Sequence, residues 1–149
     1  MYQKIFVPVD DSQASLAALH EACKIAKHAQ GVIYMTHVLD LTSFSQGGVG
    51  YLQSVVGHEA TKAEGEKVLA QAQAIVAEYG LKAEVSILEN MGDKVSKLLV
   101  NEATKHNCDV IVMGTHGWTG VMHLLMGSVA EGVLRQVDIP VILIRKKSA

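Results

Sequence analysis

One stretch of the sequence combines residue types that can hold a phosphate group. Gly114 and Gly117 follow an apolar run, and backbone N–H groups beside glycines can approach a ligand closely because no side chain intervenes. Gly127 and Ser128 then open a helical segment, whose first N–H groups and whose Ser128 hydroxyl suit an anion. The pattern predicts a phosphate site. The alternative is a tight turn followed by an ordinary helix start.

A carboxylate stands at the end of another apolar run. Asp10 follows Pro8 and Val9, and a carboxylate at a strand end is well placed to accept hydrogen bonds from ribose hydroxyls. Alternatively, Asp10 is only a turn or capping residue. Its neighbour Asp11 fits a solvated or helix-capping side chain. Asp10 is therefore the candidate for a ligand contact at this end of the chain.

Residue spacing excludes several other phosphate and catalytic motifs. The chain has no GxxxxGK[ST] loop, and its first apolar run is followed by two aspartates and a serine instead of glycines. His116 and His123 do not have a helical metal-binding spacing, so no metal site built from side chains is expected. Nothing identifies a general base, so fast hydrolysis is not predicted. A bound polyphosphate would depend on backbone dipoles, the Ser128 hydroxyl and a divalent cation.

Alternating strands and helices must position these groups. Short β-branched runs predict strands, and several are apolar almost throughout, which is typical of a parallel sheet covered on both faces. The expected strands span residues 5–9, 32–38, 83–88, 110–113 and 141–144. The order is strand, helix, strand throughout, which predicts an α/β open parallel sheet with right-handed crossovers. In such a sheet ligands bind beyond the carboxyl ends of the strands.

Apolar stripes at helical spacing lie between the expected strands. They run along residues 16–26, 68–79 and 95–103, and a fourth helix is expected from about 127 to 136. These four helices and the five strands use up the chain.

Short signals predict where these helices begin and end. Ser12 and Asp93 are expected to be N-caps, and Gly31 and Gly80 are expected to be C′ glycines in a left-handed conformation. Residues 40–57 contain four glycines and are expected to form one long connection, either mobile or a lid.

Composition limits the class of protein. A chain of 149 residues fits one domain (1–149), and 49% hydrophobic but only 5% aromatic residues predict an aliphatic core. A net charge of −2 argues against nucleic acid as a partner. No apolar run reaches the ~18–20 residues of a membrane span, so no membrane insertion is expected. Cys23 and Cys108 form no CxxC and are expected to be inert thiols in a cytoplasmic protein.

The glycine stretch resembles a known signature. Gly114, Gly117, Gly127 and Ser128 match G-2x-G-9x-G-[S/T], the ATP-binding signature of the universal stress protein family. The opening IFVPVDDS and the ending IPVILIRKK are similar to that family's first and last strands, so the resemblance covers the whole chain. It implies a Rossmann-like, adenine nucleotide alpha hydrolase-like sheet of strand order 3-2-1-4-5. The expected site then lies at the switch point between strands one and four.

The resemblance also implies a function and a set of site residues. It implies a nucleotide-dependent stress-response regulator or sensor that binds ATP, or ADP or AMP, with Mg²⁺ or Mn²⁺ on the phosphates. Asp10 would face the nucleoside, the backbone of Val38 would meet the adenine, and Ser128 would help to hold the phosphates. The complete nucleotide-binding set is Pro8, Val9, Asp10, Val38, Met113, Gly114, Thr115, His116, Gly117, Gly127, Ser128 and Val129.

One position departs from the family, and one strand suggests assembly. Trp118 stands where members often have Arg, which removes a cation near the phosphate loop. The last strand is apolar and lies at a sheet edge, where pairing with a symmetry mate would cover it. The resemblance likewise implies a homodimer through Val141, Ile142, Leu143 and Ile144.

Two other functions remain open from the sequence. One is a nucleotide-independent interaction module that contacts an unknown protein partner through Trp118 and residues 40–57. The other is a slow ATPase or autokinase.

Overall fold

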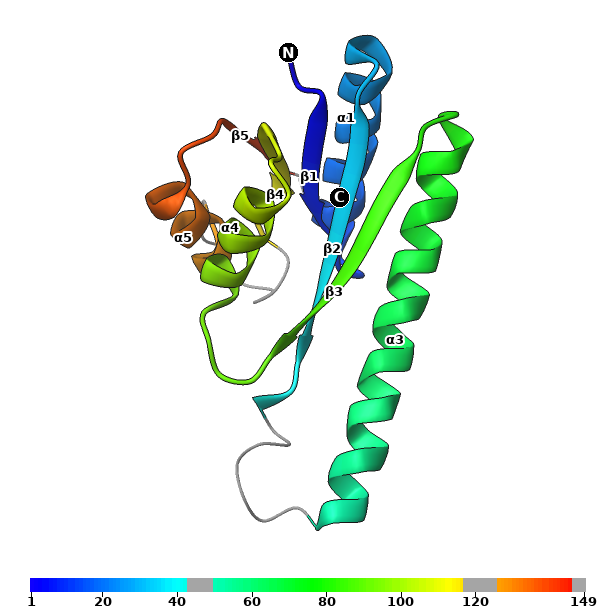
Figure 1. Ribbon diagram of the computed structural model, residues 1–149, viewed down its shortest axis with the longest axis vertical. Coiled ribbons are helices and arrows are strands. Elements are labelled where there is room, and N and C mark those ends of the chain that lie inside the picture. The colour runs from blue at the N-terminus through cyan, green and yellow to red at the C-terminus, as the bar shows by residue number, and fades with distance from the viewer. Residues whose placement is uncertain (43–49, 117–125, 146–149) are drawn as a thin grey trace.

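Five parallel strands form one sheet in the order β3-β2-β1-β4-β5, which confirms the expected order (Figure 1). The structure, a computed structural model, describes residues 1–42, 50–116 and 126–145. Strand order reverses between β1 and β4, which leaves a crevice at their carboxyl ends. The elements are β1 (Lys4–Pro8), α1 (Gln13–Ala29), β2 (Val32–Asp40), α3 (Tyr51–Glu78), β3 (Ala83–Asn90), α4 (Val95–Lys105), β4 (Val110–Gly114), α5 (Ser128–Gln136) and β5 (Val141–Ile144).

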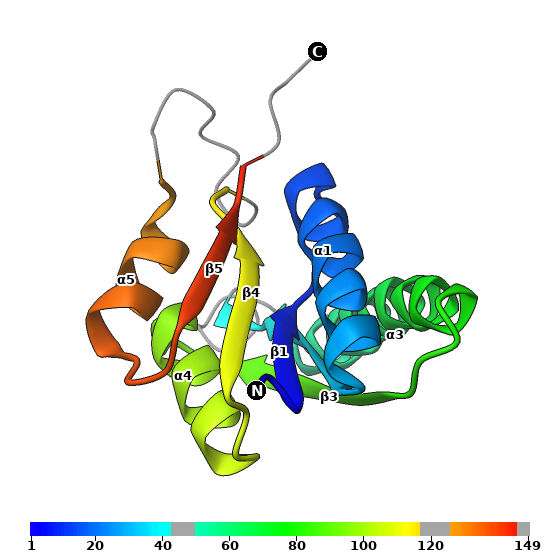
Figure 2. The same ribbon diagram turned by 90° about the horizontal axis from the view of Figure 1, so that it is seen from above.

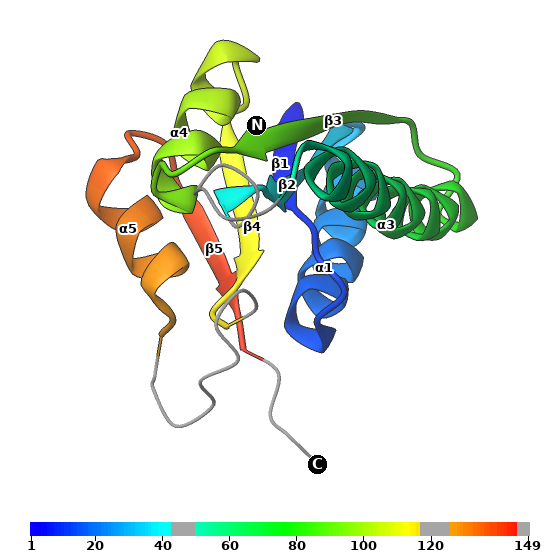
Figure 3. The same ribbon diagram turned by 90° about the horizontal axis from the view of Figure 1, so that it is seen from below.

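Helices cover both faces of the sheet. α1 and α3 lie on one side, and α4 and α5 lie on the other (Figures 2 and 3). The strand residues buried beneath α1 and α3 are aliphatic, as expected from the composition. The layer beneath α4 and α5 adds an aromatic pair, because the stacked rings of Phe6 and Tyr34 lie 5.9 Å apart. The core is therefore aliphatic on one face and mixed on the other.

Two of the four predicted helix caps are confirmed and two are wrong. The Ser12 side chain accepts a hydrogen bond from the Ser15 N–H at 3.1 Å, and Gly80 takes the left-handed conformation with φ of 72°. The N-cap of α4 is Lys94 instead of Asp93, because a turn made by Asn90 precedes it and the helix begins at Val95.

Gly31 is required for a different reason from the one expected. Gln30 takes the left-handed conformation at the end of α1, with φ of 56°. A Cβ on Gly31 would lie 2.6 Å from the carbonyl oxygen of Tyr2. The glycine therefore permits close passage of the N-terminal segment.

The expected long connection over residues 40–57 is wrong at both ends. β2 extends through Asp40, and α3 already begins at Tyr51 (Figure 1). Residues 43–49 lie outside the described part of the chain. α3 packs closely on β2 because Gly65 has no side chain: a Cβ there would lie 2.7 Å from Leu39 Cδ2. The helix is therefore longer, and the connection shorter, than the glycine count suggested.

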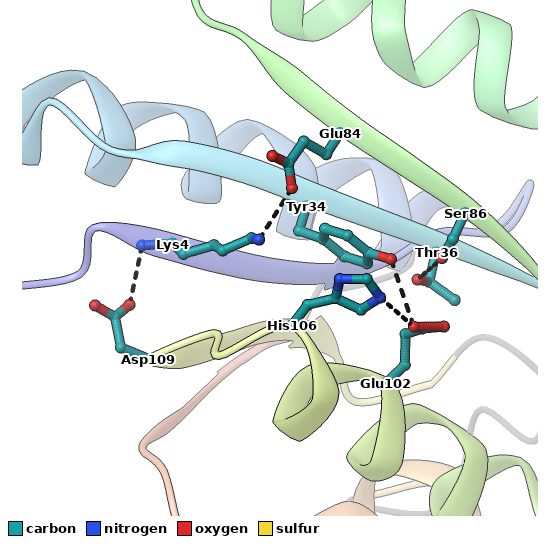
Figure 4. Close-up of polar contacts among 8 residues, drawn as sticks. All are labelled: Lys4, Tyr34, Thr36, Glu84, Ser86, Glu102, His106 and Asp109. Atoms are coloured by element: carbon teal, nitrogen blue, oxygen red, sulfur yellow. Dashed lines mark hydrogen bonds and ion pairs between the residues drawn. The ribbon is translucent and has the colours of Figure 1, made fainter.

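A polar cluster forms at the other end of the sheet, between β2, β3 and the end of α4 (Figure 4). The ring of His106 stacks on Tyr34 at 4.5 Å, and its Nε2 lies 2.7 Å from Glu102 Oε1. Lys4 Nζ lies 5.2 Å from the centre of the Tyr34 ring and 3.0 Å from Glu84 Oε2. Burial raises the pKa of Tyr34 above its ordinary value. The cluster ties α4 to the sheet away from the carboxyl edge.

Burial of both cysteines predicts that they are unreactive in the folded protein. Cys23 is 0% and Cys108 is 5% exposed, and burial raises the pKa of each thiol to about 11. Because the thiolate is the reactive form, only about one thiol in a thousand is ionised at pH 8. We expect a chromogenic disulfide reagent at pH 8 to label neither cysteine until guanidinium unfolds the chain. Rapid labelling of native protein would contradict this.

Candidate functional site

A ring of hydrogen bonds fixes Asp10 at the end of β1. Asp10 Oδ1 accepts from the Ser12 N–H at 2.8 Å, and the Asp10 N–H donates to Ser15 Oγ at 2.9 Å. Ser12 in turn caps α1. The side chain is buried, with 8% of Asp10 exposed. These bonds hold the carboxyl group at the strand end, with one oxygen committed to the turn.

Close packing brings the end of β4 against this turn. A Cβ on Gly114 would lie 2.8 Å from Ala14 Cβ and 3.0 Å from its carbonyl carbon, so only glycine lets α1 approach so near. The two segments enclose a small hollow of about 10 Å³ at the switch point. Its lining residues are Pro8, Asp10, Ser12, Ser15, Met113, Gly114 and His116.

The start of α5 is tied to the end of β4. The Gly127 N–H donates to the Thr115 carbonyl oxygen at 2.6 Å, and a Cβ on Gly127 would lie 3.0 Å from that same oxygen. This glycine therefore permits a close contact within the chain. The imidazole of His116 bonds through Nδ1 to Thr115 Oγ1 at 3.1 Å, and its buried Nε2 has no hydrogen-bond partner among the described residues.

A much larger cavity of about 730 Å³ lies on the α4–α5 side of the carboxyl edge. The ends of β2 and β3 form its floor, and the first turn of α4 and most of α5 form its walls. The lining residues are Val38, Asp40, Asn90, Lys94, Val95, Ser96, Ser128, Val129, Glu131, Gly132, Arg135 and Gln136. The volume lies within the range of about 300–1,000 Å³ that is common for small-molecule sites.

The backbone of β2 is open at the edge of this cavity. β1 pairs with β2 only as far as Thr36, whereas β3 continues to pair with it through Asp40. The Thr36 carbonyl accepts from the Val9 N–H at 2.8 Å. Because alternate residues of a strand bond to the same neighbour, the N–H and C=O of Val38 point the same way, past the end of β1. One donor and one acceptor of the backbone are therefore unpaired at the carboxyl edge of the sheet.

Two helix N-termini also line the cavity. α4 begins after Lys94 and α5 begins after Gly127, and neither helix has a side-chain cap. Their first N–H groups carry partial positive charge and lack partners within the helix. Arg135 Nη2 pairs with Glu131 Oε1 at 2.7 Å. Thr42, through its hydroxyl and its N–H, holds the pKa of Asp40 below its ordinary value, so that carboxylate is charged.

The structure divides the predicted site residues between these two places. Val38, Ser128 and Val129 line the large cavity, and Pro8, Asp10, Met113, Gly114 and His116 line the small hollow. Val9, Thr115 and Gly127 lie between these residues in the chain but line neither space. Gly117, with Trp118, lies outside the described residues. The roles assigned to the whole set stay predictions.

Sequence reasoning missed the polar wall of the cavity. Lys94 could have been found, because it follows the end of β3 at Asn90 by only four residues, and the sequence predicted that strand. Arg135 could not, since it reaches the cavity only because α5 packs against α4. That packing depends on Gly132, whose Cβ would lie 2.4 Å from Ser96 Oγ.

In the described ranges, no group of three or more His, Cys, Asp or Glu side chains is arranged to hold a metal ion. No helix in the same ranges is both long and apolar enough to cross a membrane.

Comparison with known proteins places the chain in a family. Residues 1–145 match the model of the Universal stress protein family. Universal stress protein MJ0531 of Methanocaldococcus jannaschii is 33% identical over 150 residues, which cover 98% of this chain and 84% of that protein. The structure of MJ0577 from the same organism matches with a TM-score of 0.84 at 24% identity, covering 100% of this chain and 99% of that one.

A second similar structure is a complex with a nucleotide. It is the universal stress protein from Archaeoglobus fulgidus in complex with dAMP, with a TM-score of 0.68, 24% identity, and 96% of this chain and 98% of that chain covered. Because only 24% of the residues are identical, this similarity is evidence for a shared fold alone. The full-length family match and the 33% identical relative decide the assignment, and this chain belongs to the universal stress protein family.

Proposed function

We propose that this chain binds an adenine nucleotide at the carboxyl edge of its sheet and acts as a nucleotide-dependent regulator in the stress response. One observation carries the proposal: Val38 and Ser128, from opposite halves of the chain, line the same cavity of about 730 Å³. Asp10 lies at the end of the neighbouring strand, in the switch-point hollow. A ligand that spans the two spaces would meet all three.

Each part of a nucleotide has a chemically suited group at this edge. The N–H and C=O of Val38 match the ring-nitrogen acceptor and the amino donor of adenine. The free oxygen of Asp10 can accept from a ribose hydroxyl, and the N-terminus of α5 with Ser128 can bind phosphate. In the proposal, Mg²⁺ or Mn²⁺ is held by the phosphate oxygens. The dAMP complex of the Archaeoglobus fulgidus relative supports this class of ligand.

The proposal assigns binding and assembly roles and no catalytic residue. Helix N–H groups and hydroxyls suit retention of a nucleotide. β5 pairs with β4 on one side only, and its four residues are all partly exposed. An open apolar edge of this kind supports a homodimer through Val141–Ile144. A cytoplasmic location remains part of the proposal.

The test is to look for the nucleotide directly. The protein is purified without added nucleotide and denatured, and the supernatant is analysed by ion-exchange chromatography. Titration calorimetry then follows ATP, ADP and AMP, with and without Mg²⁺. We expect either released adenine nucleotide or saturable binding of at least one of the three. Absence of both results would sink the proposal.

A further inference from the structure

Asn90 lines the cavity and has one end of its side-chain amide without a hydrogen-bond partner among the described residues. It is the last residue of β3, it is only 6% exposed, and it lines the cavity floor. Its Oδ1 accepts from the Gly92 N–H at 2.9 Å. Because an N–H can donate only to the oxygen of the carboxamide, this bond fixes which way the amide is turned. The Nδ2 group therefore occupies the other side of the side chain.

Nδ2 is a donor without an acceptor. No described residue accepts a hydrogen bond from it, whereas an oxygen of each of two polar neighbours in the cavity is engaged. Ser96 Oγ accepts from Gln136 Nε2 at 3.1 Å, and Asp40 Oδ1 accepts from Thr42 Oγ1 at 2.6 Å. The nitrogen still reaches solvent, and a ligand acceptor that takes the place of water there would receive a directed hydrogen bond.

Asn90 lies near the place proposed for the adenine base. Asn90 pairs with Asp40 in the β2–β3 register, two residues beyond Val38. The side chains of Val38, Asp40 and Asn90 all line the same cavity, on the α4–α5 face of the sheet. Ser128 lies on the opposing α5 wall, at the helix end suited to phosphate. The side-chain amide of Asn90 therefore lies near the unpaired N–H and C=O groups of Val38.

We propose that Asn90 is a specificity residue whose Nδ2 donates a hydrogen bond to a ring nitrogen of the adenine base. The assignment rests on the proposed function. If Val38 uses its N–H and C=O on N1 and the 6-amino group, the ring acceptors left for Asn90 are N3 and N7. An N–H donor at this place favours a base whose ring nitrogen accepts a hydrogen bond. It disfavours a base that carries a hydrogen at that ring position.

The decisive variant is Asn90→Asp, which keeps the oxygen that caps Gly92 and replaces the donor with an acceptor. AMP, 3-deaza-AMP and 7-deaza-AMP are titrated calorimetrically into both proteins. For the wild-type protein, we expect one of the two analogues to bind about tenfold more weakly than AMP, as loss of one hydrogen bond predicts. In the variant we expect weaker AMP binding and equal affinities for AMP and that analogue.

A charge-matched control separates base recognition from simple repulsion. Lys94→Gln makes the same change in net charge on the same cavity but leaves Asn90 in place. We expect Lys94→Gln to weaken all three ligands and to retain the discrimination between them. Should Asn90→Asp fail to fold by circular dichroism, Asn90→Ala removes the donor without adding a charge or a new donor and is read in the same way.

The outcomes are distinct. The assignment is overturned if the wild-type protein binds AMP and both deaza analogues equally well. It is also overturned if a variant without the Asn90 donor still discriminates between AMP and the analogue. Either result leaves the proposed function standing. A wild-type protein that releases no adenine nucleotide on denaturation and binds none of ATP, ADP and AMP overturns the proposed function, and the assignment with it.

Discussion

Asp10→Asn is expected to weaken adenine nucleotide binding by about 10- to 100-fold, as loss of a hydrogen bond to a charged group predicts. Asparagine keeps the side-chain oxygen that accepts from the Ser12 N–H at 2.8 Å, so the turn before α1 is retained. It removes the negative charge from a group that is only 8% exposed. Calorimetric titration with ATP and Mg²⁺ measures the change, and an unchanged melting temperature shows that the fold is intact.

Asp11→Asn is the matched control. It removes the same charge one residue away, from an exposed side chain. Because water screens an exposed carboxylate, we expect less than a threefold change in affinity. Equal losses in the two variants would indicate a general effect of charge and would contradict a specific contact at Asp10. An unaltered affinity in Asp10→Asn would contradict it as well.

Phe6→Ala is expected to lower the free energy of unfolding by about 3–5 kcal/mol, the usual loss for a buried phenylalanine. Phe6 is 0% exposed and lies on β1, at the centre of the sheet. Its ring packs against Tyr34 at 5.9 Å, in the layer beneath α4 and α5. Removing it leaves a void that the strand backbone cannot close. Guanidinium unfolding followed by circular dichroism measures the loss.

Phe6→Leu separates volume from aromatic contact. Leucine restores most of the lost volume, so we expect it to recover more than half of the stability that Phe6→Ala loses. A loss below about 1.5 kcal/mol in Phe6→Ala would show that the side chains beneath α4 and α5 repack around the void. It would contradict the expectation that the void stays open. The expected loss for Phe6→Ala is a large share of the total, because the free energy of unfolding of a domain is commonly about 5–15 kcal/mol.

Local signals in the sequence predicted the elements well. β-branched runs marked the five strands, and Ser12 and Gly80 marked helix ends that the structure confirms. The strand order came from the resemblance of the glycine stretch to a family signature, since periodicity alone does not order strands. Failures arose where a local signal had two meanings. Glycines within residues 40–57 indicated a loop, yet α3 already includes residues 51–57.

The edge of the sheet that carries the site could also be predicted from the sequence. Strand ends in a parallel sheet meet at one edge, so Asp10 and Val38 had to lie there together. The helical segment after Gly127 had to begin at the same edge, because every crossover returns the chain to the opposite end of the sheet. These constraints follow from chain direction alone.

The shape and the polar lining of the cavity were decided by tertiary structure. One cavity is lined by Lys94, Arg135 and Asn90 together. This is because α5 packs against α4 through Gly132 and because β2 extends several residues beyond its pairing with β1. Neither fact is encoded in a local pattern. Periodicity shows which face of a helix is buried, but the helix that lies opposite depends on the fit of side chains far apart in the chain.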